Sequence, residues 1–473
     1  MRSCAPTVEG RFPFHIDPPR HSPYNPAVFL DTDLLVIGAG AKGTAMAMKA
    51  HVINRLGLGP VRMTVVEATG PAAAWLDGNG VSSSREVLAI SPSKDVGFPY
   101  QATSAFGPVG AEIDRAALEF SWQRYLVEKG DYGHWVDAGS PSVQRRVYGA
   151  YLAWVLARST EGVSSVRGRV ARISLAPQGD RWLVDIAGES GPRQCVCRSL
   201  ALTGPGVHRS IPTDLDAAPR VLDCDSGRME LTRVAAERSS DIAIVGGGES
   251  ALSCMEFVRA LKPDARLTVY TPSLPMSRVE SFVENRIFSN PEEIDWPSLS
   301  VETRRDFIAR SDRGVFGPER IAAFAYDERC HFVPGRVLQI RASGGGAQVR
   351  VEHACPGGVA AGTHDYVINC TGFDLLEQLR VLLCDEARAE LERRVGPVWE
   401  RPEGTELQMG RFLELEGMDP RLHLPGLAGL SQGPGFANLG ALGVLADRVL
   451  QPYGLADATP SRRARAQAGE AHR

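Results

Sequence analysis

Residues 33–43, with the sequence DLLVIGAGAKG, decide the fold of this chain. A short apolar run stops at a glycine-rich turn, and a helix-like stretch of small residues, TAMAMKAHVINRL, follows. Gly38 allows the tight turn, Gly40 lets the backbone approach a pyrophosphate, and Gly43 permits close packing of the helix on the strand. The pattern predicts a strand, a phosphate-binding turn and a helix whose free N–H groups face the anion.

A carboxylate follows at the distance that such a motif requires. The segment VRMTVVE is typical of a second strand and ends at Glu67, where a carboxylate would bind ribose hydroxyls. A glycine-rich turn of an ordinary α/β protein is the alternative, and the joint presence of strand, helix and acid disfavours it. We therefore expect a Rossmann-like dinucleotide-binding unit here.

A second strand, turn and helix begins at Asp241. In DIAIVGGGESALSCMEFVRAL, Gly246, Gly248 and Ala251 have the spacing G-x-G-x-x-A, and Ser250 lies in the same turn. Two such motifs in one chain are far more specific than one. The sequence therefore predicts a second dinucleotide site, with Gly246, Gly248 and Ser250 contacting the cofactor.

The residues after the second motif indicate which coenzyme binds there. The strand ARLTVY ends at Tyr270 and Thr271 without the acid that NAD-selective sites carry, and Ser273 and Arg278 lie just beyond. Because a phosphate needs a cation rather than a carboxylate, this pattern favours NADPH, with Arg278 as a phosphate ligand. An ordinary surface arginine is an equally good interpretation of Arg278.

Length and composition describe a globular protein of about two or three domains. The 473 residues are 43% hydrophobic and 23% charged, and the formal net charge of −4 gives no reason to expect nucleic-acid binding. Residues 1–30 are interrupted by prolines and lack a continuous apolar core. We expect an extended arm there, rather than a signal peptide or a membrane span.

The nine cysteines are scattered, odd in number and without the paired spacing of a zinc site or a disulfide framework. This usage is typical of a reducing cytoplasm, and we expect no metal. Cys195 and Cys197 alternate in the strand-like CVCRSLALTG, which favours buried, inert thiols over a redox pair.

Four strings are much more specific than the glycine motifs: SPSKDVGFPY, FVENRIFSNP, RSDRGVF and LSQGPGFANLGALGVLADRVL. With the two motifs they make residues 33–450 resemble the flavin-dependent N-hydroxylating monooxygenases that act on lysine or ornithine in siderophore biosynthesis. Within that family the chain looks most like the mycobactin-type lysine N-hydroxylases. The resemblance implies hydroxylation of the side-chain amine of L-lysine, or of a close analogue, by molecular oxygen through a flavin hydroperoxide.

The resemblance also implies the architecture: an α/β fold with two Rossmann-like dinucleotide-binding domains, for FAD and NADPH, and a small, mainly helical substrate-binding insertion. FAD would bind at Gly38, Gly40, Gly43 and Glu67, and NADPH at the second motif. We expect an extended arm at 1–30, an FAD-binding domain at 31–212 and 366–452, an NADPH-binding domain at 213–277 and 327–365, the substrate-binding insertion at 278–326 and a disordered tail at 453–473.

Three residues take substrate-binding roles by resemblance. Lys94 would bind the substrate carboxylate, Asn285 would contact the substrate, and Asp312 stands where the family has a second asparagine near the nicotinamide ribose. The family's glutamine five positions before the lysine is Ala89 here. Because Asp312 and Ala89 depart from the family's residues, the choice between lysine and ornithine as substrate stays open. Without the resemblance, Lys94 and Asp95 would be interpreted as a solvated pair. The expected partners are this small amine substrate and oxygen, and a homo-oligomer is compatible with the sequence.

Further cofactor contacts are expected around the flavin. Thr371 and Gly372 of NCTGFD correspond to the family's alanine-threonine-glycine signature, and Gly433 lies in a glycine-rich loop that leads into the last helix. Two interpretations of Trp75 are equally good: its ring lies against the flavin, or it packs in the core. No general base is evident, and we assign no catalytic residue.

Two other flavoprotein classes lack their signatures in this chain. The F-x-G-x-x-x-H-x-x-x-W string associated with Baeyer–Villiger and sulfur-oxygenating enzymes is absent, and so is the C-x-x-x-x-C pair of a disulfide reductase. A non-catalytic nucleotide-binding scaffold is the alternative from another class, since fold alone does not establish chemistry.

Overall fold

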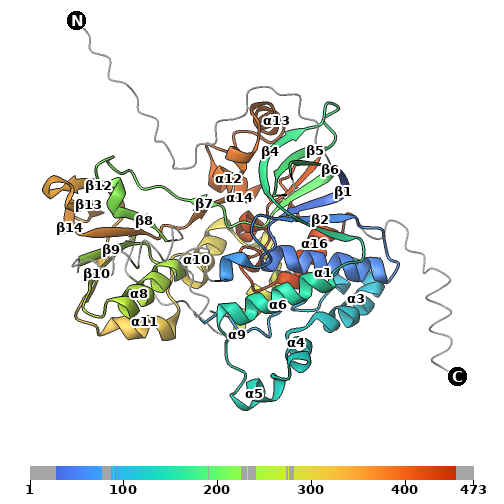
Figure 1. The fold of residues 1–473 in the computed structure, drawn as a ribbon, viewed down its shortest axis with the longest axis horizontal. Coiled ribbons are helices and arrows are strands. Elements are labelled where there is room, and N and C mark those ends of the chain that lie inside the picture. Colours follow the sequence, from blue (N-terminus) through green and yellow to red (C-terminus); the bar gives the residue numbers. More distant parts are fainter. Residues whose placement is uncertain are drawn as a thin grey trace, which may run out of the picture.

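The computed structural model describes residues 28–76, 87–88, 90–189, 191–224, 232, 241–272, 275, 278 and 282–453. A mixed sheet and a parallel sheet lie side by side, with helices packed on both (Figure 1). The α/β fold with two Rossmann-like units is confirmed. Ala89, Ser273 and nearly all of the expected arm and tail lie outside the described residues.

The first sheet is built around the strand of the first glycine motif. Its strand order is β3-β2-β1-β6-β5-β4, and β17 also pairs with β6. The pairs of β1 with β2 and β6, of β2 with β3 and of β6 with β17 are parallel, whereas β4, β5 and β6 pair antiparallel. The strands are β1 (Val28–Ile37), β2 (Met63–Glu67), β3 (Val163–Arg167), β4 (Arg169–Leu175), β5 (Trp182–Ala187), β6 (Arg193–Leu202) and β17 (Arg421–His423).

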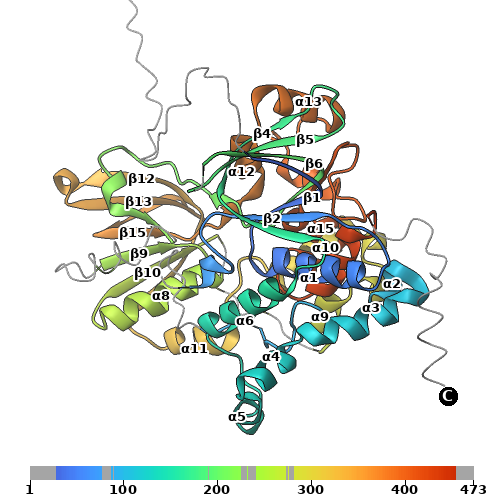
Figure 2. The ribbon, with the colours of Figure 1, turned by 45° about the vertical axis from the view of Figure 1, so that its right-hand side comes forward.

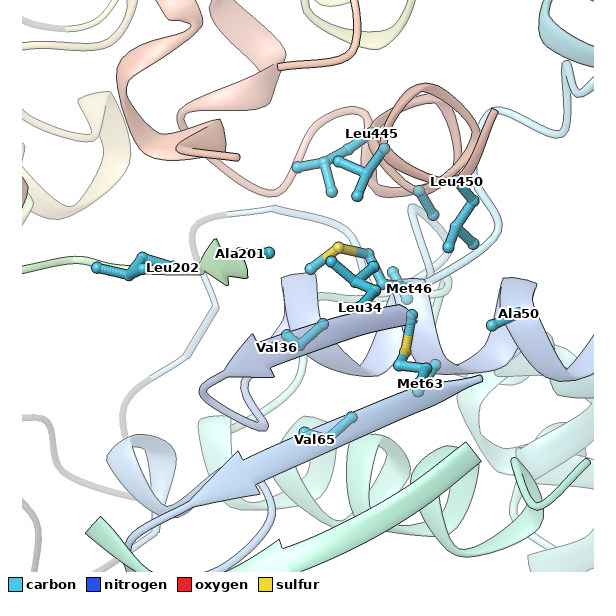
Figure 3. Close-up of a cluster of buried hydrophobic side chains, with 14 of the residues drawn as sticks. Leu34, Val36, Met46, Ala50, Met63, Val65, Ala201, Leu202, Leu445 and Leu450 are labelled. Carbon is cyan, nitrogen blue, oxygen red and sulfur yellow. The ribbon is translucent and has the colours of Figure 1, made fainter. Parts of the chain in front are cut away.

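Helix α1 (Ala41–Arg55) follows β1 directly and is buried on almost every side. Its alanines let it approach the sheet closely, and α16 (Leu442–Leu450) closes over it from the far end of the chain. Figure 3 shows Leu445 and Leu450 of α16 lying over Leu34 of β1 and Met46 of α1. The surrounding helices are α2 (Thr103–Phe106), α3 (Gly110–Ala117), α4 (Trp122–Lys129), α5 (Tyr132–Asp137) and α6 (Arg145–Arg158).

The second sheet is entirely parallel, with the order β11-β10-β9-β15-β8. Side chains alternate across its central strand: Ile242 and Ile244 pack on α8, whereas Ala243 and Val245 pack on a three-stranded antiparallel sheet. Figure 2 shows these two layers on opposite faces. The elements are β8 (Val221–Asp223), β9 (Asp241–Val245), α8 (Glu249–Leu261), β10 (Arg266–Thr271), β11 (Cys330–Pro334), β12 (Val337–Ser343), β13 (Gln348–Cys355), β14 (Gly358–His364) and β15 (Tyr366–Asn369).

The expected insertion is helical, but its last helix packs elsewhere. Helices α9 (Phe282–Ser289) and α10 (Val301–Ser311) contact the C-terminal glycine-rich loop, whereas α11 (Pro318–Ala325) packs on the second sheet through Phe324. The remaining elements are β7 (Val207–His208), β16 (Phe373–Asp374), α12 (Leu375–Leu382), α13 (Asp385–Val395), α14 (Pro402–Leu407) and α15 (Gly429–Gln432).

Three details differ from the expected division of the chain. Strand β15 pairs with β9 and β8, so residues 366–369 belong to the second sheet and not to the first unit. Strand β1 begins at Val28, so the sheet includes three residues expected in the arm. Tyr453, expected in the tail, pairs its hydroxyl with Nε2 of His423 at 2.8 Å. These differences arise from long-range pairing, which local patterns do not report.

The cysteine pair in β6 is buried, as the alternation predicted. Burial raises the pKa of the Cys195 thiol to about 12 and that of Cys197 well above its ordinary value. A thiol rather than a thiolate is a poor nucleophile, so these cysteines are packing residues.

Candidate active site

A cavity of about 1300 Å³ opens where the carboxyl ends of the two sheets face each other. This edge is where open α/β sheets bind their ligands, and the volume exceeds the roughly 300–1000 Å³ of ordinary ligand pockets. Both glycine motifs line it, and so do the residues that directly follow β6 and β15. The lining residues include Gly38, Gly40, Lys42, Glu67, Trp75, Thr203, Gly246, Gly248, Ser250, Asp312, Arg313, Arg336, Thr371, Gly372, Ala437 and Asn438.

The three glycines of the first motif are required for different reasons. Gly38 has φ +107°, and a Cβ there would collide with the Thr203 side chain. A Cβ on Gly43 would collide with the carbonyl oxygen of Gly38. Gly40 has ordinary extended angles, and its added Cβ would meet no protein atom within 4 Å. Only Gly40 therefore faces open space, which fits a pyrophosphate approaching the N-terminus of α1.

Glu67 at the end of β2 holds the turn and also lines the cavity. Its carboxylate accepts hydrogen bonds from the Ala39 N–H at 2.9 Å and from the Thr69 N–H at 3.2 Å. The Thr69 hydroxyl donates a third hydrogen bond at 3.3 Å, and because a carboxylate offers about four acceptor positions, about one is left for a ribose hydroxyl.

The second motif repeats this arrangement at the C-terminal end of β9. Gly246 has φ +148°, and a Cβ there would collide with the Cys370 carbonyl group, whereas a Cβ on Gly248 would come no closer than 3.9 Å to another residue. Thr371 donates its hydroxyl to Oδ1 of Asn369 at 2.7 Å, and Gly372 has φ +94°. The residues present thus fit two dinucleotides, one on each motif.

Trp75 packs on the core and also reaches the cavity. Its ring stacks on Tyr148 with centroids 5.1 Å apart, and it also lines the cavity. The packing role is therefore observed, and a place against the flavin stays a prediction.

The structure brings the first two substrate candidates together across 191 residues of chain. Lys94 donates from Nζ to Oδ1 of Asn285 at 3.1 Å, and its ammonium lies 5.7 Å from the centre of the Phe98 ring. Neither residue lines the large cavity, so Lys94 and Asn285 of α9 form a separate polar pair.

Asp95 is not solvated, contrary to the interpretation made without the resemblance, because its side chain is only 1% exposed. Its carboxylate accepts hydrogen bonds from the Gly97 N–H, the Tyr100 hydroxyl and the Trp122 N–H at 2.9–3.0 Å. Burial raises the pKa of Asp95 to about 6, and these hydrogen bonds oppose the rise. The carboxylate thus anchors the loop that presents Lys94.

Asp312 lines the cavity in a polar cluster that also contains Lys42 and Asn438. Asn438 donates to Oδ1 of Asp312 at 3.2 Å, and Lys42 donates from Nζ to the Ala437 carbonyl at 2.9 Å. Burial lowers the pKa of Lys42 to about 8, against the attraction of Asp312, and raises the pKa of Asp312. Sequence reasoning missed Lys42, although a lysine inside a phosphate-binding glycine motif was a visible signal.

Three predicted cofactor residues lie away from the cavity lining: Gly43, which packs α1 on the turn, and Arg278 and Gly433. Arg278 forms an ion pair with Glu249 at 3.9 Å, close to the N-terminus of α8. Gly433 is buried against Pro291, with which a Cβ would collide, so its φ of +140° serves packing. The pattern identified an arginine and a glycine of suitable type, but the tertiary structure directs both elsewhere.

Buried polar contacts hold the helical insertion on the loop that carries Ala437 and Asn438. Trp296 Nε1 and Arg304 donate to the Leu430 carbonyl at 3.1 and 2.9 Å. Arg448 of α16 donates to Glu292 at 2.9 Å. These contacts fix the loop that forms one wall of the cavity to the unit built on the first sheet.

A family model described as L-lysine 6-monooxygenase/L-ornithine 5-monooxygenase matches residues 115–375. The chain is 35% identical over 428 residues to the L-lysine N6-monooxygenase MbtG of Mycolicibacterium paratuberculosis, covering 88% of this chain and 94% of that protein. This chain belongs to the lysine/ornithine monooxygenase family. The MbtG of Mycobacterium tuberculosis is likewise 35% identical over 435 residues, 89% of this chain and 95% of its own.

Solved structures agree with this family. The lysine monooxygenase NbtG from Nocardia farcinica has a TM-score of 0.77 and 36% identity, covering 88% of this chain and 99% of that one. The ornithine hydroxylase PvdA from Pseudomonas aeruginosa, at 20% identity, has a TM-score of 0.67, covers 90% of this chain and 100% of its own, and shares the fold.

Two further findings concern the described part of the chain alone. None of its helices combines the length and hydropathy that a membrane span needs. In the same residues no group of three or more His, Cys, Asp or Glu side chains is arranged to hold a metal ion.

Proposed function

We propose that this enzyme hydroxylates the side-chain amine of L-lysine with molecular oxygen, using FAD and NADPH, in siderophore or related natural-product biosynthesis. The observation that carries the proposal is the single cavity lined by both glycine motifs, which lets two dinucleotides meet. Family membership and the lysine monooxygenases among its relatives support the choice of reaction. The described cysteines form no disulfide bond, which supports a cytoplasmic location. A homo-oligomer stays a prediction.

The two motifs divide the cofactors between them in this proposal. Gly38, Gly40 and Glu67 hold FAD, with Trp75 at its edge, and the second motif holds NADPH through Gly246, Gly248 and Ser250. FAD reduced by NADPH supplies the oxygen-activating chemistry. The protein's own contribution is to position the groups and to exclude water around them.

Lys94 is the proposed anchor of the substrate carboxylate. Asn285 accepts a hydrogen bond from the Lys94 ammonium and so holds this cation in place. Asp312 and Asn438 form the polar end of the cavity. The side-chain amine of free lysine has a pKa of ~10.4, so deprotonating it at pH ~7.5 costs about 4 kcal/mol. Partial desolvation in the site lowers the pKa of the amine and therefore this cost.

Wild-type and Lys94→Ala proteins, incubated with FAD, NADPH and a panel of amines, test this proposal. Mass spectrometry should show that wild-type enzyme adds one oxygen to L-lysine in preference to L-ornithine. Lys94→Ala loses a charge-assisted contact worth about 1.5–3 kcal/mol, so its KM for lysine should rise while NADPH-dependent flavin reduction is retained.

Three outcomes would count against parts of this picture. Oxygenation of ornithine alone would show that the substrate is one methylene shorter than lysine. A pocket distinguishes two substrates that differ by one methylene by about 1–3 kcal/mol. Oxygenation only of amines without a carboxylate, or unchanged lysine kinetics in Lys94→Ala, would contradict the carboxylate anchor.

Lys42 is proposed to contribute a cation to the anionic cofactor beside Gly40. Because burial lowers its pKa to about 8, the ammonium is present below that pH and is lost above it. Wild-type affinity for FAD, measured by fluorescence titration of apoprotein on both sides of pH 8, should therefore fall as the pH rises. Lys42→Met should bind FAD several-fold more weakly below pH 8 and lose this pH dependence. An equally steep fall in the variant would exclude Lys42 as its source.

A further inference from the structure

An exposed arginine on the cavity wall has no role in the reaction as derived so far. Arg336 follows β11 in the turn to β12, and it lines the cavity together with Tyr270 and Pro272. The N–H of Gly335 donates to the Thr271 carbonyl at 2.6 Å. This hydrogen bond ties the turn that carries Arg336 to the C-terminal end of β10.

The order of strands places Arg336 relative to a bound dinucleotide. In a Rossmann-like unit the pyrophosphate lies at the turn after the first strand, and the adenosine ribose faces the end of the next strand. Here those strands are β9 and β10, and β11 pairs with β10 so that Pro334 lies opposite Thr271. Arg336, two residues after Pro334, therefore stands beside the place from which a ribose 2′-phosphate would project.

Among the arginines that line the cavity, Arg209 and Arg336 form no ion pair with a described carboxylate. Arg209 follows β7, whereas Arg336 lies next to the end of β10. Arg313 is paired with Glu406 at 3.0 Å, Arg209 donates to the Phe373 carbonyl, and Lys42 lies in the field of Asp312. Within the described ranges, no carboxylate forms an ion pair with Arg336. A guanidinium that is not already neutralised can bind a phosphate with two parallel hydrogen bonds.

Arg278, the arginine expected from the sequence, is a poorer candidate for this role. It lies outside the cavity lining, and its guanidinium already faces the carboxylate of Glu249. A phosphate would have to compete with that carboxylate.

We propose that Arg336 binds the 2′-phosphate of NADPH and sets the preference for NADPH over NADH. The proposal rests on the use of NADPH stated above and names the residue that recognises the one group distinguishing the two coenzymes. Arg336 is exposed, so its replacement leaves the buried core unchanged.

Binding of 2′,5′-ADP and 5′-AMP to the FAD-loaded enzyme, measured by calorimetry, tests this role without turnover. Arg336→Ala should weaken the binding of 2′,5′-ADP by about 10- to 100-fold and leave that of 5′-AMP unchanged, because only the former carries the phosphate. Arg336→Lys, which retains a charge but not the planar fork, should show a smaller loss. Arg341→Ala removes an exposed arginine of β12 that faces Glu352 and should change neither affinity.

The outcomes separate this proposal from the one on which it rests. If Arg336→Ala binds 2′,5′-ADP as tightly as wild type does, or if Arg278→Ala causes the loss instead, Arg336 is not the ligand, and the NADPH-dependent reaction still stands. If wild-type enzyme binds the two nucleotides equally, both the NADPH preference and the role of Arg336 are overturned. The measurement is independent of which amine is hydroxylated, so failure to oxygenate lysine leaves it interpretable.

Discussion

Gly40→Leu is expected to abolish FAD retention in a protein that still folds. Gly40 has φ −76° and ψ −167°, which any residue can adopt, and an added Cβ would meet no protein atom within 4 Å. The leucine side chain would instead occupy the space over the N-terminus of α1, where we propose that the pyrophosphate binds. Losing charge-assisted hydrogen bonds there costs roughly 3 kcal/mol or more, which is at least about a 100-fold loss of affinity.

The flavin-to-protein absorbance ratio after gel filtration measures this retention, and circular dichroism of the apoproteins checks the fold. Gly133→Leu is the matched control, since Gly133 of α5 also faces open space but lies away from the cavity. It should keep its FAD. Full FAD occupancy in folded Gly40→Leu protein would show that the first motif does not hold the pyrophosphate.

Asp447→Leu is expected to lower the free energy of unfolding by about 3–5 kcal/mol. Lys49 of α1 and Asp447 of α16 form an ion pair at 2.7 Å, with side chains 0% and 1% exposed. The nearest other carboxylate, Asp114, is 3.9 Å from Nζ of Lys49. Removing Asp447 leaves a buried ammonium without its close partner, and the cost of burying that charge is then uncompensated. Urea unfolding followed by circular dichroism measures the change.

The double variant Lys49→Met/Asp447→Leu separates the charge from the packing. With both charges replaced by apolar side chains, most of the lost stability should return, because no uncompensated ion stays buried. Glu377→Gln, which breaks the exposed pair with Arg380, should cost less than about 1 kcal/mol. A double variant as unstable as Asp447→Leu alone would show that packing, and not charge, accounts for the loss.

Local sequence patterns predicted the framework because each depends on neighbouring residues. The strand, turn and helix around Gly38 and Gly246 follow from backbone requirements within about ten positions of chain, and both formed as expected. The resemblance placed Lys94 and Asn285 in substrate roles, and their hydrogen bond shows that the two residues do meet. Their roles toward a substrate stay predictions.

The sequence by itself determined that two dinucleotide-binding units are present, which positions form their turns, and that the chain resembles an N-hydroxylating monooxygenase. Only the tertiary structure decided that Asp95 is buried, that Lys42 shares a cluster with Asp312 and Asn438, and that Arg336 rather than Arg278 lines the cavity. The reason is physical: turn and helix signals act between near neighbours, whereas burial and charge pairing depend on which distant strands the packing of the sheets brings together. Arg278 and Arg336 have the same chemistry, but the pairing of β11 with β10 places Arg336 on the cavity wall, whereas Arg278 faces Glu249.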